Sequence, residues 1–215
     1  MPDDKSLFFY GRLYHLLLDR PLAGARRVVT SLVPDGSSVL DVACGTGLLC
    51  TALREKNCRV TGLDLSLRML RFAEKRNRHD DVRFVHGDAT DLSGFEDRSF
   101  DYATLLLLLH ELPRESQLRV LGEAARVADH LVIVDSVVPL PRNAGGCGIR
   151  LVEATFGHDH HPQFKAFLAG GGIMGALEAS GLPLAIGHRA IFWRGCREVV
   201  VASKAPLAAV GRANS

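Results

Sequence analysis

Short apolar runs alternate with helical stretches through the middle of the chain. The apolar runs that predict strands are Val39–Val42, Val60–Leu63, Val82–Val85, Phe100–Leu109 and Leu131–Val134. Between them, helical spacing covers residues 47–56 and 118–127, and Ser66 is the expected N-cap of a helix with Leu67, Leu70 and Ala73 on one face. Strands that are apolar on both faces and alternate with helices predict a parallel sheet covered on each side.

Both ends of the chain depart from this alternation. Residues 6–33 predict two amphipathic helices, and residues 137–148 are expected to be a loop because they contain two prolines and three glycines. Residues 151–180 read as helical with a break at residues 170–172. Leu184–Trp193 and Val199–Ala202 flank Arg194-Gly195, which predicts a β-hairpin. The whole pattern predicts an α/β fold with a seven-stranded mixed sheet.

Composition and charge narrow the class of protein. Hydrophobic residues make up 47% and charged residues 23% of 215 residues, which fits one globular domain, and a net charge of +2 gives no sign of a nucleic-acid surface. Five cysteines without a CxxC pair suit free thiols in a reducing cytoplasm. The longest apolar run, Leu105–Leu109, is far too short to cross a bilayer. We expect a soluble, cytoplasmic monomer or homodimer.

The strongest functional signal is a glycine loop after the first strand, in VLDVACGTG at residues 39–47. Gly45 and Gly47 allow a sharp turn and let a ligand lie against bare backbone. The dinucleotide fingerprint G-x-G-x-x-G fails because Cys50 occupies its third glycine position. Asp41, just before the loop, would repel a pyrophosphate and attract an ammonium or sulfonium group.

Two further acids follow the next two predicted strands. Asp64 ends the second strand and Asp88 follows the third, so both are expected at the same sheet edge as Asp41. Ligands of open α/β sheets bind at the carboxyl ends of the strands, and an acid about 20 residues beyond a glycine loop can accept ribose hydroxyls. Three carboxylates at one edge therefore predict a nucleoside site.

With these residues in place, the chain resembles the class I S-adenosylmethionine-dependent methyltransferases. The matching stretches are VLDVACGTG (39–47), VTGLDLSLRML (60–70), FVHGDATDL (84–92) and FDYATLLLLLHEL (100–112). The resemblance is greatest to the ubiquinone and menaquinone methyltransferase branch. It implies a Rossmann-like three-layer sandwich with strand order 3-2-1-4-5-7-6, the last strand antiparallel, and S-adenosyl-L-methionine as cofactor.

The resemblance also implies a division of the chain and roles for its residues. Residues 1–205 would be one domain: an N-terminal helical lid (1–36), a cofactor-binding core (37–137), substrate-side loop and helices (138–182) and a C-terminal hairpin (183–204), followed by a flexible tail (206–215). The implied cofactor-binding residues are Asp41, Ala43, Gly45, Thr46 and Gly47 for the methionine part, Asp64 for the ribose, Leu65, Met69, Asp88 and Ala89 for the adenine, and Leu105 and His110 beyond the fourth strand.

Histidines are the candidate catalytic residues. His110 lies at the end of the fourth strand, and His158, His160 and His161 fall in the region that covers the substrate in the resembling family. Each could contact substrate or move a proton, but packing, or a polar helix start in the case of the cluster, is the open alternative. We expect no metal, because adjacent ligands point in divergent directions and Arg114 stands where a zinc-protease HExxH motif needs its second histidine.

The expected reaction is methyl transfer to a small-molecule acceptor by in-line displacement. Leu105-Leu106-Leu107 replaces the Asn/Asp-Pro-Pro-aromatic box of base methyltransferases, and no basic-aromatic cluster suggests nucleic acid. Two alternatives stay open. One is a catalytically inactive S-adenosylmethionine-binding partner or regulatory subunit, and the other is an NAD-dependent oxidoreductase.

Overall fold

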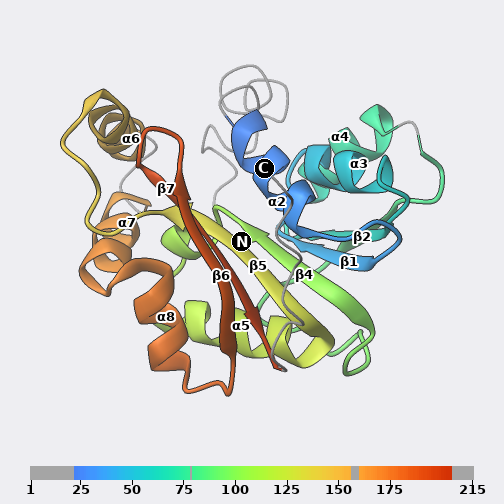
Figure 1. Cartoon of the computed structure of the whole chain (residues 1–215). Helices are drawn as coiled ribbons and strands as arrows, with labels where there is room; N and C mark the ends of the chain where they lie inside the picture. The colour runs from blue at the N-terminus through green and yellow to red at the C-terminus, as the bar shows by residue number, and fades with distance from the viewer. Residues whose placement is uncertain (1–21, 78, 156–159, 205–215) are drawn as a thin grey trace, which may run out of the picture.

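The computed structural model of the chain describes residues 22–77, 79–155 and 160–204 (Figure 1). Within them, one sheet has the strand order β3-β2-β1-β4-β5-β7-β6. The strands are β1 (Ser38–Val42), β2 (Arg59–Asp64), β3 (Arg83–His86), β4 (Phe100–Leu106), β5 (Ala128–Ser136), β6 (Ala185–Phe192) and β7 (Arg197–Ser203). Strands β1 to β5 pair in parallel, whereas β7 pairs antiparallel with both β5 and β6. The predicted strand order and antiparallel last strand are confirmed.

Helices cover both faces of the sheet and complete the three-layer sandwich (Figure 1). The α-helices are α2 (Ala23–Leu32), α3 (Leu48–Arg54), α4 (Leu67–Arg76), α5 (Arg114–Val127), α6 (Ala144–Thr155), α7 (His160–Ala169) and α8 (Gly172–Ser180). A short 3₁₀ turn, η3 (Leu109–Glu111), follows β4. The predicted helix break at residues 170–172 separates α7 from α8.

Alternation along the buried strands divides the core between the two faces. On β7, Val199 and Val201 join the cluster that contains residues of α2 to α4, whereas Val200 and Ala202 join the cluster that contains residues of α5, α7 and α8. Successive side chains of a strand point to opposite faces, so one apolar run fills both layers.

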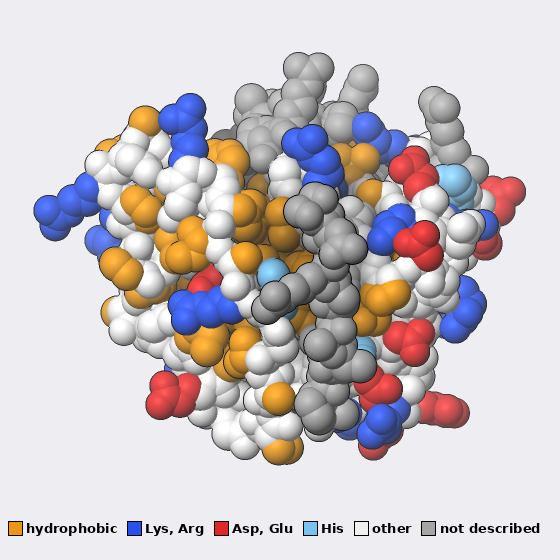
Figure 2. All heavy atoms as spheres, viewed as in Figure 1, with side chains coloured by type: hydrophobic (Ala, Val, Ile, Leu, Met, Phe, Trp, Pro, Cys, Tyr) orange, Lys and Arg blue, Asp and Glu red, His pale blue; other side chains and the backbone are white. Residues whose placement is uncertain are grey.

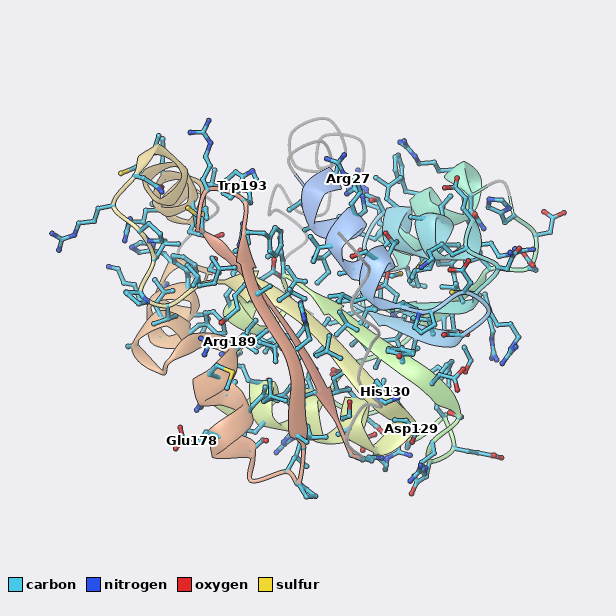
Figure 3. The ribbon with its side chains drawn as sticks, viewed as in Figure 1. Arg27, Asp129, His130, Glu178, Arg189 and Trp193 are labelled. Atoms are coloured by element: carbon cyan, nitrogen blue, oxygen red, sulfur yellow. The ribbon has the colours of Figure 1, made fainter. Side chains whose placement is uncertain are left out.

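The parallel strands bring their carboxyl ends to one edge of the sheet. In Figure 3, His130, near the start of β5, and Trp193, just after β6, mark opposite edges. Strand β1 pairs with β2 on one side and with β4 on the other, so the connections leave in opposite directions from β1. This reversal opens a crevice at the carboxyl edge, where open α/β sheets bind their ligands.

Three sequence predictions need correction. Strand β4 ends at Leu106 rather than at residue 109, because Leu107 adopts a left-handed conformation with φ 58°. Leu67 is 51% exposed, and Met69, Leu70 and Ala73 form the buried face of α4. Helix α6 begins at Ala144, inside the predicted loop. The predicted N-cap is confirmed, since Ser66 accepts a hydrogen bond from the Met69 amide.

The surface carries several exposed apolar side chains. Figure 2 shows hydrophobic side chains gathered on the viewed face beside β6 and β7, and Ile186, Ile191 and Trp193 are among the exposed large hydrophobic residues. None of the described helices has the length and apolar character required to span a bilayer. The predicted first helix and tail lie outside the described residues.

Candidate active site

The glycine loop joins β1 to α3 through backbone conformations that favour glycine. Ala43, Gly45 and Gly47 have φ values of 59°, 53° and 72°. A Cβ atom at Gly45 would meet no atom within 4 Å, whereas one at Gly47 would lie 2.9 Å from both the Cβ of Ala73 and the ring of Phe84. Gly45 therefore offers bare backbone to a ligand, and Gly47 allows α3 to pack closely on its neighbours.

A cavity of about 310 Å³ opens beside this loop at the carboxyl edge of the sheet. Its polar lining comes mainly from three carboxylates, Asp64, Asp88 and Glu111. The remaining lining is largely apolar and consists of Ala43, Gly45, Leu63, Leu65, Ser66, Met69, Ala89, Thr90, Leu106, Leu107, Leu108, Leu112 and Val120. A mostly apolar cavity with a few convergent polar groups is the usual form of a small-molecule site.

Asp64, at the end of β2, links the glycine loop to the N-terminus of α4 through hydrogen bonds. Its Oδ2 accepts a hydrogen bond from the Gly45 amide at 2.7 Å, and its Oδ1 accepts one from the Ser66 amide at 2.8 Å. Burial raises the pKa of the Asp64 carboxyl, and the two amides oppose that effect. Each carboxylate oxygen keeps a second acceptor position, so Asp64 can still accept two hydroxyl groups from a ligand.

Asp88 is held by a local turn. One of its oxygens, Oδ1, accepts hydrogen bonds from both the amide and the hydroxyl of Thr90, each at 2.8 Å. Asp88 and the adjacent Ala89 both line the cavity. The other oxygen of Asp88 is therefore able to meet a ligand donor, such as an exocyclic amino group.

Asp41 lies in a second, smaller cavity of about 50 Å³ that shares Ala43 and Gly45 with the first. Burial raises the pKa of its carboxyl to about 6, although hydrogen bonds from the Thr104 hydroxyl (2.7 Å) and the Cys50 thiol (3.3 Å) oppose the rise. Arg26, from α2, lines the same cavity. A ligand group with both a positive and a negative end could thus place the positive end near Asp41 and the negative end near Arg26.

Most of the predicted cofactor-binding residues meet at these two cavities. The large cavity is lined by Ala43, Gly45, Asp64, Leu65, Met69, Asp88 and Ala89, and the small one by Asp41, Ala43, Gly45 and Thr46. Gly47, Leu105 and His110 line neither cavity. Leu105 is 1% exposed and belongs to the core, and its successors Leu106, Leu107 and Leu108 line the large cavity instead.

His110 is buried behind the cavity rather than exposed to it. Its Nδ1 lies 2.8 Å from Oδ1 of Asp135, and its Nε2 lies 3.6 Å from Oε1 of Glu153. Burial lowers the pKa of His110, but Asp135, Glu111 and Glu153 raise it, with a net value of about 9. Phe164 and Phe167 pack edge-on against the ring. His110 is therefore an imidazolium that holds buried carboxylates.

The predicted histidine cluster is described only in part. His158 lies outside the described residues, and so does the side chain of His160 at the start of α7. His161 lies on α7, and its Nδ1 is buried without a hydrogen-bond partner. The described residues contain no group of three or more histidine, cysteine, aspartate or glutamate side chains that could hold a metal.

Sequence reasoning missed two charged residues that line the cavities. Glu111 was passed over in favour of its neighbour His110, and Arg26 comes from a helix with no recognisable motif. The signal for Glu111 was available, because it is an acid directly after an apolar strand that ends at the ligand-binding edge. No sequence signal marks Arg26.

The chain is similar in sequence to known methyltransferases over its central part. Residues 39–130 match the methyltransferase domain family. A demethylmenaquinone methyltransferase from Bacillus licheniformis is 39% identical over 99 residues, which are 44% of this chain and 41% of that protein. The chain thus spans about two fifths of the length of this curated relative.

Solved structures share the fold at low sequence identity. A Pyrococcus horikoshii protein, PH0226, has a TM-score of 0.66 at 18% identity, with 94% of this chain and 96% of that chain covered. A SAM-dependent methyltransferase from Aquifex aeolicus has a TM-score of 0.60 at 21% identity, with 83% and 88% covered. The sheet order, the cavity at the glycine loop and the segment that matches the methyltransferase domain family together support a class I S-adenosylmethionine-dependent methyltransferase domain in this chain.

Proposed function

We propose that this chain transfers the methyl group of S-adenosylmethionine to a small, largely apolar acceptor by in-line displacement. The observation that carries the proposal is the set of strand-end carboxylates around bare backbone at Gly45. When bound, the cofactor supplies an electrophilic methyl group on a sulfonium. Transfer of that methyl needs little covalent help from protein, so orientation in a dry cavity provides most of the rate.

The described residues fit such a cofactor. Asp64 would accept the ribose hydroxyls, Leu65 and Met69 would flank the adenine, and Asp88 with Ala89 would meet its amino edge. In the small cavity, Asp41 and Thr46 would face the amino group of the methionine part. Arg26 would face its carboxylate, which is the natural partner of a guanidinium.

The walls of the large cavity support a small, largely apolar acceptor. Leucines 106, 107, 108 and 112 line it beyond the glycine loop, so a charged macromolecular segment would lose its hydration without compensation. The curated relative described above is a demethylmenaquinone methyltransferase, and its name indicates a quinone-type acceptor for that protein. A small aromatic acceptor is the matching expectation for this chain.

Cofactor affinity tests the proposal. Asp64→Ala is expected to weaken S-adenosylmethionine binding at least tenfold in calorimetry, about 1.4 kcal/mol or more, because the ribose loses its acceptor. The matched control is Asp101→Ala. Asp101 also accepts a backbone amide at 2.7 Å, from Ser38, but at the opposite edge of the sheet, so affinity should be unchanged.

Two results would contradict the proposal. Equal affinity in the wild type and Asp64→Ala would remove Asp64 from the site. Tight cofactor binding without methylated product from any acceptor in metabolite extracts, followed with radiolabelled methyl donor, would instead favour the inactive cofactor-binding subunit.

A further inference from the structure

Three carboxylates line the large cavity, and two of them are already engaged by the protein. Asp64 accepts two backbone amides, and Asp88 accepts an amide and a hydroxyl. Within the described part of the chain, the carboxylate of Glu111 has no hydrogen bond or ion pair of its own. Among the three, Glu111 is therefore the carboxylate with neither oxygen engaged by a described residue, so both of its oxygens can meet a reacting group.

The turn that carries Glu111 is held firmly from behind. The side-chain amide of the buried Gln117 donates hydrogen bonds from its Nε2 to the carbonyl oxygens of Leu109 and Leu112, both at 3.0 Å. Asp135 accepts a hydrogen bond from the backbone amide of His110 at 3.2 Å in addition to its contact with the ring. Rigid support of this kind fixes the position of a side chain that takes part in chemistry.

The 3₁₀ turn sends neighbouring side chains in different directions. His110 is 5% exposed and packs among buried aromatic rings, whereas Glu111 is partly exposed and lines the cavity. The strand before the turn ends early because Leu107 adopts a left-handed conformation, and the Leu107 amide still bonds to the Val134 carbonyl at 2.8 Å. This local geometry presents Glu111, and not His110, to a bound molecule.

The burial and the charges around Glu111 bring its pKa into the range of a proton acceptor near neutral pH. The pKa of Glu111 is raised to a net value of about 7: burial raises it most, the His110 imidazolium opposes the rise, and the charges of Glu153, Asp135 and Asp64 add to it. A base is most effective when its pKa lies near the working pH. A carboxylate with an ordinary pKa would be a much weaker base.

We propose that Glu111 is the general base that removes the proton from the acceptor's nucleophile, and that His110 with Asp135 positions it. This inference rests on the proposed methyl transfer and adds the class of acceptor: a neutral molecule whose attacking oxygen or carbon bears an acidic proton, such as a phenol or hydroquinone. An acceptor that is already anionic would be repelled by the carboxylates lining the cavity.

The step balances in atoms and charge. The nucleophile's electron pair forms the new bond to the methyl carbon, and the S–CH₃ bond breaks with its electron pair left on sulfur, which becomes a neutral thioether. The proton of the nucleophile passes to an oxygen of Glu111. The positive charge of the sulfonium and the negative charge of Glu111 both disappear, and Glu111 then returns its proton to water.

Glu111→Gln tests the inference with one readout that needs no turnover. In cofactor-free protein labelled with ¹³C at glutamate carboxyl carbons, NMR should show one carboxyl that titrates near pH 7 in the wild type and is missing in Glu111→Gln. Calorimetry with S-adenosylhomocysteine should give affinities within about twofold of each other for these two proteins. The matched control is Glu115→Gln, which replaces an exposed carboxylate in the first turn of α5 and should leave both readouts unchanged.

Turnover supplies the second readout, with 1,4-naphthalenediol as the probe acceptor. Glu111→Gln is expected to lower kcat by about 10²–10⁴-fold with little change in KM, and Glu111→Asp to recover part of the loss. In the wild type, kcat should rise as pH passes through about 7 and then level off, and this rise should vanish in Glu111→Gln.

The outcomes separate this inference from the proposed function. Product formation at an undiminished rate in Glu111→Gln, or a Glu111 carboxyl that titrates near pH 4, would overturn the role of Glu111 and leave methyl transfer standing. Absence of cofactor binding in the wild type would overturn both. If the wild type binds cofactor but does not methylate the probe, the phenolic acceptor class is wrong, and the NMR titration alone then decides whether Glu111 can serve as a base.

Discussion

The two sides of the large cavity hold their carboxylates in opposite ways. On the side of β2 and β3, Asp64 and Asp88 are fixed by backbone amides within a few residues of the strand ends. On the side of β4 and β5, Asp135 and Glu153 lie beside the buried His110 imidazolium, and the carboxylate of Glu111 has no hydrogen bond to a described residue. The first arrangement suits binding of a fixed ligand, and the second suits movement of a proton.

The largest expected effect is a loss of stability when the ion pair of His110 and Asp135, on the side of β4 and β5, is broken. Asp135→Asn leaves the His110 imidazolium without its nearest counter-charge in a buried setting. Loss of one partner of a buried ion pair costs about 3–5 kcal/mol of unfolding free energy, measured by urea denaturation at pH 6. The exposed pair of Glu115 with Arg119 is the contrast, and Glu115→Gln should cost less than about 1 kcal/mol.

The pH dependence of this stability loss tests whether it comes from the positive charge on His110. Its pKa is raised from 6.5 to about 9 in the folded protein, so the ion pair stabilises fully below pH 6.5, and its contribution is lost as pH rises through about 9. The difference in unfolding free energy between wild type and Asp135→Asn should therefore shrink between pH 6 and pH 9.5. A constant difference would mean that His110 is neutral throughout.

A smaller effect separates the two glycines on the first side. Gly47→Ala places a methyl group 2.9 Å from Ala73 and Phe84 at a left-handed φ of 72°, which should lower the unfolding free energy by about 2–3 kcal/mol. Gly45→Ala meets no neighbour and should cost about 1 kcal/mol, from its left-handed conformation alone. Calorimetry should show the reverse order for cofactor affinity, with the greater loss in Gly45→Ala. Equal losses of cofactor affinity in the two variants would contradict a position of Gly45 against the ligand.

The smallest effect concerns Ala43, which adopts φ 59° at the start of the loop. Ala43→Gly relieves the left-handed strain but increases the freedom of the unfolded chain, so a net stabilisation of about 0.5–1 kcal/mol is expected. Thermal unfolding followed by circular dichroism would measure it as a small rise in Tm. A fall in Tm would show that the Ala43 methyl group packs usefully against its surroundings.

The sequence predicted the first side of the cavity well because its interactions are local. The glycine loop and the acids at the ends of β2 and β3 each lie in a short motif, and parallel strands bring those motifs to one edge. The second side depends on a contact between His110 and Asp135, which are 25 residues apart in separate elements. A histidine with an ordinary pKa looks like the better catalyst in a sequence, and only the fold shows that it is buried.

The misplaced start of α6 has a similar cause. Gly145 and Gly146 looked like loop residues, but a Cβ atom at Gly146 would lie 1.9 Å from the Pro141 carbonyl oxygen. The glycine is needed there for close packing of a helix, while Arg150 donates hydrogen bonds to the carbonyl oxygens of Pro141 and Leu140. Glycine in a sequence does not distinguish a flexible segment from a close approach of two backbones.

The dual hydrogen bonding of Asp64 limits how this site can be redesigned. Removal of the Asp64 carboxylate leaves both the Gly45 amide and the Ser66 amide without their acceptor, so it disturbs the glycine loop and the start of α4 together. Leu65, by contrast, lines the cavity with a side chain that is 66% exposed. Engineering for donors with altered bases should therefore vary Leu65 and leave the carboxylate that ties the two elements in place.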